Sequence, residues 1–178
     1  MSCNLSQGRQ EVCKESIGGI QGVYFINFES GSFSKDGNGL VNDLSSLTAY
    51  YYELKGTSAY TETVNSSREN GTTFFSQEVS LNLKKLTNEM TTQLKLLAYG
   101  RPQIIVWTKN GEALLVGEEN GADLTAGTIQ TGAALGDLYG YSIQMTAEEK
   151  LPAAFISGST SANAFAGLGA NAPTIVYS

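Results

Sequence analysis

The chain has 178 residues, of which 41% are hydrophobic and 16% are charged. This composition is too apolar for a disordered chain, and no run of about 18 apolar residues is present to span a bilayer. Acidic residues outnumber basic ones by 17 to 11, for a formal net charge of −6. That balance argues against a protein that holds nucleic acid by its phosphates. We expect one soluble domain without a membrane anchor.

Histidine is absent from the sequence, which removes the usual catalytic triads and most metal clusters. Cys3 and Cys13 are the only cysteines, and two ligands cannot complete a tetrahedral zinc site within one chain. We expect reduced, partly buried thiols, with a disulfide or a metal site shared between chains as the alternatives. The amino terminus lacks a basic start followed by an apolar stretch, so we expect synthesis in a cytoplasm.

The first part of the chain predicts two strands separated by a loop. Residues 23–28 form a short apolar run rich in β-formers, which indicates a strand. Residues 30–42 combine glycines with serines, aspartate and asparagines, which is typical of an exposed loop. Residues 47–55 are mostly aromatic and apolar at strand length, and predict the second strand.

The next segment predicts a long hairpin. Residues 59–66 alternate threonines with larger side chains, and Glu69-Asn70-Gly71 supplies a tight turn. Residues 72–84 then show the clearest alternation in the chain, with the inner face formed by Phe75, Gln77, Val79, Leu81 and Leu83. Gln77 is the one polar interruption of that face. At about 3.3 Å per residue the second strand extends roughly 40 Å, which is long enough to reach beyond its own core.

A helix and a second hairpin follow. Thr87 or Asn88 can cap the helix, a stripe that includes Met90 and Leu94 recurs at helical spacing, and Gly100 ends it. Residues 103–108 form a buried type of strand. Asn110-Gly111 is a strong hairpin signal, so residues 112–117 are predicted to return as its partner.

The carboxyl-terminal part is richer in small residues. Residues 122–136 have loop character, with a short strand near residues 128–131 as one interpretation. Residues 139–146 alternate apolar and polar side chains and predict a strand. Residues 148–152 mark the end of the regular core or an edge strand, because proline cannot donate to a central ladder. From residue 157 onward the side chains are too small to build a core, although residues 174–177 are able to add a strand to a neighbour.

Several acidic residues are candidates for metal ligands or catalysts. Glu118, Glu119 and two later aspartates, Asp123 and Asp137, lie among glycines, as calcium-binding residues often do. Their spacing does not match the twelve-residue calcium loop, so solvated turn acids are the favoured interpretation. Glu148 and Glu149 are adjacent in a strand and point to opposite faces, so they cannot converge on one bond. We therefore predict no catalytic residue, no metal site and no cofactor.

Aromatic residues offer a carbohydrate-stacking platform as an alternative function. The candidates are Trp107, Tyr50, Tyr51, Tyr52, Tyr139 and Tyr141. Half-buried packing and subunit contacts are the more frequent use of such residues in a β-rich chain.

The order of the elements resembles that of phage tail-tube-type structural proteins, with the closest likeness to those of phages with Bacteroidetes hosts. The likeness rests on the hairpin of residues 60–83, the helix of residues 88–99, the hairpin of residues 104–117 and the stretch Gly132-Ala133-Ala134-Leu135-Gly136-Asp137-Leu138-Tyr139-Gly140-Tyr141. It covers roughly residues 18–155, between an N-terminal arm (1–17) and a small-residue-rich tail (157–178), so the tail-tube-like domain is expected to span residues 18–156.

The resemblance implies a β-sandwich or half-open barrel flanked by one helix. Six copies would close a ring whose inner strands join into one barrel, and rings would stack into a tube that conducts DNA without binding it tightly. The partners would be further copies and other virion tail proteins, in a tail made in the host cytoplasm. The loop 30–42 or the tip 68–71 would form the projection between rings. The alternatives are a single connector ring of a virion and a carbohydrate-binding or adhesin module.

The self-assembly interface is predicted on the long hairpin, because unpaired strand edges and a projecting hairpin are buried only by a partner. Its residues are Tyr60, Glu62, Val64, Phe75, Gln77, Val79 and Leu81.

Overall fold

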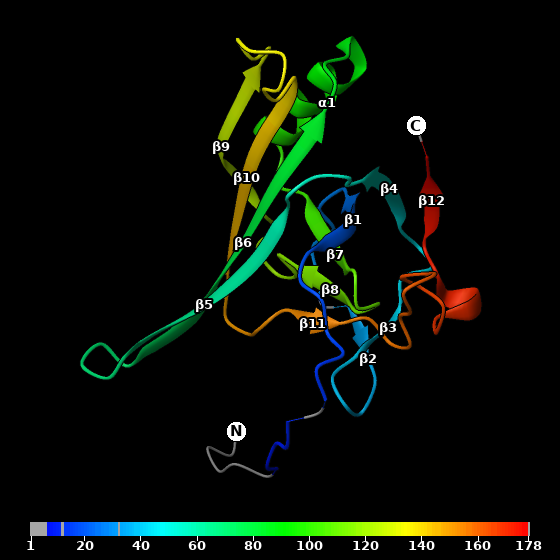
Figure 1. Ribbon diagram of the computed structural model, residues 1–178. Coiled ribbons are helices and arrows are strands. Elements are labelled where there is room, and N and C mark those ends of the chain that lie inside the picture. The colour runs from blue at the N-terminus through cyan, green and yellow to red at the C-terminus, as the bar shows by residue number, and fades with distance from the viewer. Residues whose placement is uncertain (1–6, 12, 32, 178) are drawn as a thin grey trace.

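The structure is a computed structural model that describes residues 7–11, 13–31 and 33–177. In this part of the chain it is mainly β, with one α-helix and several sheets, none of which closes into a barrel (Figure 1). The strands are β1 (Ile20–Ile26), β2 (Ser34–Lys35), β3 (Val41–Asp43), β4 (Thr48–Glu53), β5 (Ala59–Ser67), β6 (Thr72–Lys84), β7 (Gln103–Thr108), β8 (Ala113–Val116), β9 (Asp123–Gln130), β10 (Gly140–Glu149), β11 (Ala154–Phe155) and β12 (Thr174–Val176).

The first large sheet has six strands in the order β11-β8-β7-β1-β4-β12. The predicted hairpin around Asn110-Gly111 is confirmed, because β7 and β8 pair antiparallel on either side of it. Gly111 has a φ of 96°, and a Cβ there would lie 2.5 Å from the amide nitrogen of Ser161, so only glycine fits. The predicted strands around residues 23–28 and 47–55 are β1 and β4, which pair at the centre of this sheet.

The second large sheet has four antiparallel strands in the order β5-β6-β10-β9. The predicted long hairpin is confirmed as β5 and β6, with Ala59 opposite Ser80 and Ser67 opposite Thr72. β10 lies in the middle of the sheet and ends at Glu149, within residues 148–152, where the sequence predicts that the regular core ends.

The main core lies between the two sheets (Figure 1). Apolar side chains of β1 and β7 face those of β6 and β10; among them are Val23, Phe25, Ile104, Val106, Val79, Leu81, Ile143 and Met145. At about 25 cal/mol per Å² of buried apolar surface, this layer is the main source of the fold's stability.

The helix α1 (Asn88–Tyr99) begins and ends as the sequence predicts. The Thr87 hydroxyl accepts a hydrogen bond from the Met90 amide (3.1 Å), and the chain leaves the helix at Gly100. Leu94 packs into the core between the sheets. No helix in the described part of the chain is long and apolar enough to cross a membrane.

A second core covers the other face of the six-stranded sheet. Tyr24 and Trp107 on that face are covered by Phe165 and Leu168 from the carboxyl-terminal segment. A 3₁₀ turn, η1 (Gly169–Asn171), then leads into β12, which pairs in parallel with β4 of the same chain. The prediction that this segment contributes no core is therefore wrong, and its last strand completes the chain's own sheet.

Two loop predictions are also wrong in part. Within residues 30–42, β2 and β3 form a short antiparallel pair, and Val41 is fully buried. Within residues 122–136, the strand β9 (Asp123–Gln130) is longer and earlier than the predicted strand near residues 128–131. β9 is held by pairing with β10 along almost its whole length.

Candidate assembly surface

The four-stranded sheet presents a polar face, which is bordered at one end by the segment between β4 and β5. On β6, alternate residues Ser76, Glu78, Ser80 and Asn82 point away from the core, as their partial exposure between buried neighbours shows. Their cross-strand partners on β10 are equally polar: Glu148, Thr146, Gln144 and Ser142. Along this face hydroxyl and amide groups predominate, and its acids outnumber its bases.

Both edges of this sheet are long and open. In the described part of the chain, β5 pairs only with β6, and β9 pairs only with β10. Each edge carries an apolar side chain in solvent: Val64 on β5 is 59% exposed and Ile129 on β9 is 54% exposed. Open strand edges with apolar side chains are ready templates for pairing with another chain.

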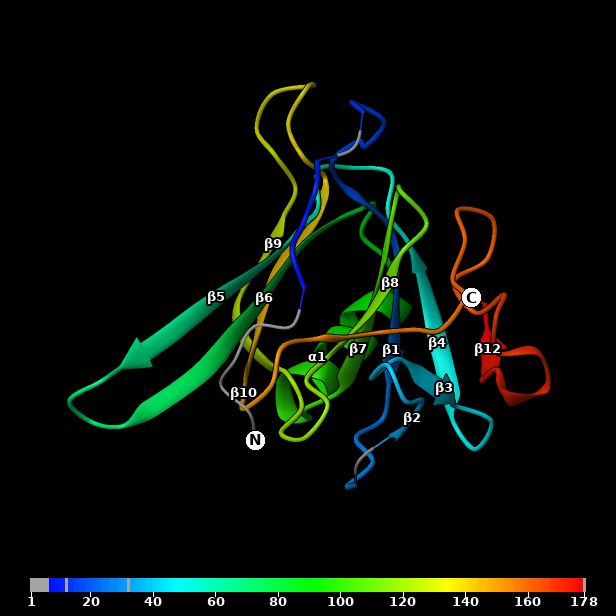
Figure 2. The same ribbon diagram turned by 90° about the horizontal axis from the view of Figure 1, so that it is seen from below.

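The far end of the β5–β6 hairpin projects from the body (Figures 1 and 2). β10 stops at Glu149, opposite Phe75, so the hairpin continues beyond it without a third strand. In this part Val64 and Phe75 form a directly opposed apolar pair, and Phe74 is exposed on the other face. At about 3.3 Å per residue, the 13 residues of β6 extend about 43 Å.

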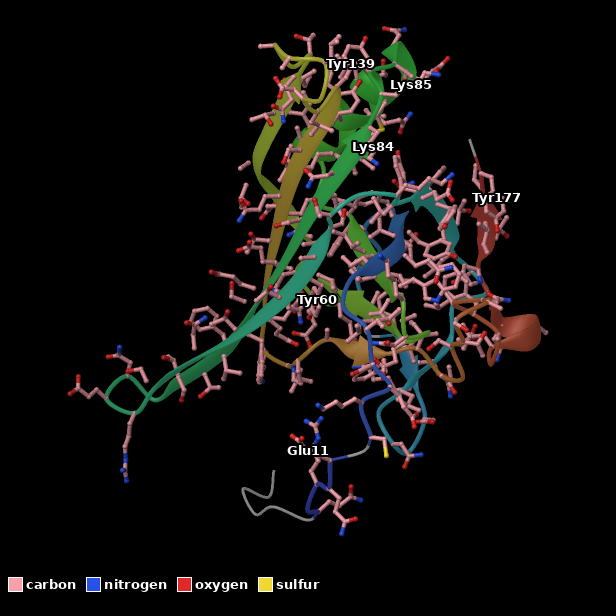
Figure 3. All side chains as sticks on the ribbon, in the orientation of Figure 1. Glu11, Tyr60, Lys84, Lys85, Tyr139 and Tyr177 are labelled. Carbon is pink, nitrogen blue, oxygen red and sulfur yellow. The ribbon has the colours of Figure 1, made fainter. Side chains whose placement is uncertain are left out.

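A hydrogen-bonded junction holds the hairpin where it leaves the body. Gln77 is 1% exposed; its Oε1 accepts from the Gly117 amide (3.0 Å), and its Nε2 donates to Glu62 Oε1 (3.2 Å). The same Glu62 oxygen accepts from the Ala153 amide (3.1 Å). The Tyr60 hydroxyl donates to the other Glu62 oxygen (3.1 Å), and Figure 3 places Tyr60 at the base of the hairpin. These bonds tie both hairpin strands to the loop after β8 and to the chain after β10.

Two groups near this junction have shifted pKa values. Burial, reinforced by the charge of Glu62 and by the hydrogen bond to it, holds the pKa of the Tyr60 hydroxyl above its usual range. Burial also raises the pKa of Glu149, although its carboxylate accepts hydrogen bonds from the Asn120 amide (2.8 Å) and the Glu119 amide (3.1 Å). Glu149 thereby holds the turn that follows β8.

The structure narrows the predicted interface. Val79 and Leu81 lie in the core between the sheets, and Gln77 lies in the junction, so all three contact their own chain. Alternation along β6 turns these three side chains inward, so they are not exposed to a second copy in this structure. The accessible members are Val64, which is exposed, with Tyr60, Glu62 and Phe75, which are partly buried. The predicted interface omits β9, whose Ile129 is the counterpart of Val64 on the opposite edge.

The aromatic residues of the predicted sugar platform lie in different parts of the fold. Trp107 is 6% exposed, and its indole N–H donates to the Thr160 carbonyl beneath the carboxyl-terminal segment (2.9 Å). Tyr141 is fully buried in the other core, and Tyr139 is exposed at the far end of the four-stranded sheet (Figure 3). Trp107 and Tyr141 are therefore not available for stacking on a sugar, whereas Tyr50 and Tyr139 are exposed.

The turn acids considered as calcium ligands lie apart. Glu118 forms an ion pair with Lys35 (2.7 Å), and Asp137 accepts from the amides of Ala133 and Ala134. These amide bonds lower the pKa of Asp137. Among the described residues, no group of three potential ligands is close enough to hold a metal ion. Cys13 is exposed rather than partly buried, and Cys3 lies outside the described residues.

Comparison with protein-family models, with curated proteins and with solved structures finds no match for this chain.

Proposed function

We propose that this chain is a structural subunit of a phage tail tube. Copies close into a ring through the edges of their four-stranded sheets, rings stack into a tube, and the tube conducts DNA. The observation that carries the proposal is the pair of long open edges, β5 and β9, on opposite sides of one sheet with a polar face.

The strand directions support closure by rotation. The four strands alternate in direction across the sheet, so β5 and β9 run antiparallel to each other. A copy rotated about a common axis therefore offers its β5 to the β9 of its neighbour in the antiparallel sense that sheets favour. The contact is heterologous, and a heterologous contact that closes on itself produces a ring.

The resemblance to tail-tube proteins supplies the number of copies. Four strands from each of six copies would give a barrel of roughly 24 strands, and closure would remove every open edge of that sheet. With strands about 4.8 Å apart and tilted by about 40°, such a barrel would be about 48 Å wide between backbones. The apolar faces would point outward to the six-stranded sheets, and the polar faces would line the channel.

The chemistry of the polar face suits passage of DNA. Glu78 and Glu148 project from it, and Lys84 lies at its end. Because DNA affinity comes from cations that displace counterions from phosphates, an acidic and hydroxyl-rich wall does not retain the polyanion. Other virion tail proteins would contact the two ends of the tube, in a particle assembled in the host cytoplasm.

Electron microscopy of the purified protein in negative stain, with light scattering, tests this proposal. We expect rings or tubes and a mass several times the 18.9 kDa of one chain. Tubes would indicate the repeating subunit, and single rings that never stack would indicate a connector. A strict monomer at high concentration in both measurements would refute the assembly.

A further inference from the structure

The two open edges of the four-stranded sheet are staggered along the strands. β5 lies beside the hairpin half of β6, from Thr72 to Ser80. β9 pairs with β10, on the far side of β10 from β6. It lies level with the opposite half of β6, from Glu78 to Lys84. Figure 1 shows the same offset, with β9 beside the end of the sheet near α1 and β5 running toward the projecting tip. A neighbouring copy must therefore be displaced along the strands before its β5 lies beside β9.

The displacement has few allowed values. The midpoints of the two edge strands differ by about five residues along β6. An even displacement is required, because side chains alternate between faces and the polar face must continue from one copy to the next. Displacements of four and six residues satisfy both conditions.

In a closed barrel the displacement of each copy becomes a tilt of the strands. A displacement of four residues is about 13 Å along the strands. The four strands of each copy span about 19 Å across the sheet. The ratio of these two lengths gives a strand tilt of about 35°. Six residues give a tilt of about 46°. Strands in closed barrels tilt by about 35–45°, so the stagger within one chain already has the size that closure requires.

The side chains distinguish the two registers. With a displacement of four residues, Tyr60 lies opposite Ile129, and Val64 lies on the same face as Leu124, just past the bulge in β9. With six, the Glu62 carboxylate lies opposite Ile129. Tyr60 and Leu124 already pack at the margins of the main core, so the first register extends that core across the junction between copies.

From the stagger and these pairs, we propose that β5 of one copy pairs antiparallel with β9 of the next in a single register, with Thr61 opposite Thr128 and Thr63 opposite Ala126. At each edge, the pairing strand belongs to a second copy of this chain. The four-residue register buries Val64 and Ile129, and it places a hydroxyl pair on the polar face. The inference rests on the proposed ring assembly and specifies its contact.

Disulfide trapping between copies tests the register. Thr61→Cys and Thr128→Cys are combined in one chain whose native cysteines are replaced, Cys3→Ser and Cys13→Ser. Directly opposed residues have Cα atoms about 4.5–5.5 Å apart, within the range of a disulfide. The matched control combines Thr63→Cys with Thr128→Cys, which are opposed only in the six-residue register and otherwise lie about 7–8 Å apart on the diagonal. Within one chain these positions lie on opposite edges of the sheet, so any bond joins two copies.

After mild oxidation we expect a ladder of covalent oligomers from the Thr61/Thr128 pair, at least about fivefold more than from the control pair. Equal or stronger trapping by the control pair would overturn the register.

Microscopy of the cysteine-free parent is run alongside. Rings without trapping by the Thr61/Thr128 pair refute the register and leave the assembly standing, whereas a parent that stays monomeric refutes the proposed function itself. If the Thr61/Thr128 variant does not assemble, Thr63→Cys with Ala126→Cys tests the same register, and its failure to trap in rings would also overturn it.

Discussion

The two large sheets differ in how fully the chain itself covers them. The six-stranded sheet is covered on one face by the four-stranded sheet and α1, and on the other by the carboxyl-terminal segment. Its edge strands, β11 and β12, have only two and three residues. The four-stranded sheet has one partly exposed polar face and edges of nine and eight residues. The first sheet is covered within one chain, and the second is the sheet that we propose neighbouring copies complete.

This contrast predicts that shortening a buried side chain on the six-stranded sheet lowers the stability of the fold more than a change elsewhere. Phe165→Ala removes a buried ring whose centre lies 4.8 Å from that of Tyr24. We expect the free energy of unfolding to fall by about 3–5 kcal/mol, measured by urea denaturation. Leu135→Ala, at a fully exposed side chain, is the control and is expected to change it by less than about 0.5 kcal/mol. Equal effects would show that the carboxyl-terminal segment is not part of the core.

The second largest loss of stability is expected at the hydrogen-bonded junction where the β5–β6 hairpin leaves the body. Gln77→Ala leaves the Gly117 amide without its acceptor and removes a donor from Glu62. Because the Gly117 amide is buried there, we expect a loss of about 1–3 kcal/mol by guanidinium denaturation. Gln144→Ala, on the polar face, serves as the control and should cost less than about 0.5 kcal/mol. A neutral Gln77 variant would mean that the hairpin is not anchored at this junction.

Glu149 makes the stability of this junction depend on pH. Burial raises its pKa in the folded chain above its usual value of 4.5, so the folded state binds the proton more tightly than the unfolded state. Its stabilising contribution is therefore fully present below pH 4.5 and is lost as the pH rises through the raised value. We expect the unfolding free energy of the Glu149→Gln variant to lack this loss with rising pH when the variant and the unchanged protein are compared across that range. Parallel curves would contradict the assignment.

The smallest effect on the subunit is expected at the open edge. Val64→Lys replaces an exposed side chain and should cost less than about 1 kcal/mol of folding stability, yet a lysine on an edge strand opposes pairing with another chain. We expect rings and tubes to be lost while the circular dichroism spectrum is unchanged. The control is Ile17→Lys, at a side chain of similar exposure (60%) away from the edge. Assembly that survives the change at Val64 but not the change at Ile17 would relocate the interface.

Local signals explain which elements the sequence predicts. Asn110-Gly111 and Glu69-Asn70-Gly71 fix two turns, and the alternation along β6 fixes its buried face, so both hairpins follow from short-range chemistry. The stripe and cap of α1 act over the same short distances. The class of the fold, mainly β with one helix, follows from these parts.

The remaining elements depend on contacts between distant parts of the chain. β9 has few large side chains, and it is a strand because β10 supplies its hydrogen bonds. In the carboxyl-terminal segment, Phe165 and Leu168 are isolated among small residues without a periodic pattern. Gly158 and Gly167 approach so closely that a Cβ on Gly158 would lie 2.6 Å from the Cα of Gly167, which lets the segment pack flat on the sheet. Such packing has no signal in local sequence.

The candidate surface was predictable only in outline. The hairpin is identifiable by its length, but the division of its side chains between core and solvent depends on where β10 ends. Gln77 stands out in the sequence as a polar residue on an apolar face, and only the positions of Gly117 and Glu62 show that it anchors the hairpin.

Amide hydrogen exchange at low and high protein concentration tests most directly whether the four-stranded sheet carries the interface. We predict that the amides of β5 and β9 become protected as concentration rises, while those of β11 and β12 stay unchanged. Protection confined to β11 and β12, or no change at any edge while large assemblies form, would contradict the account.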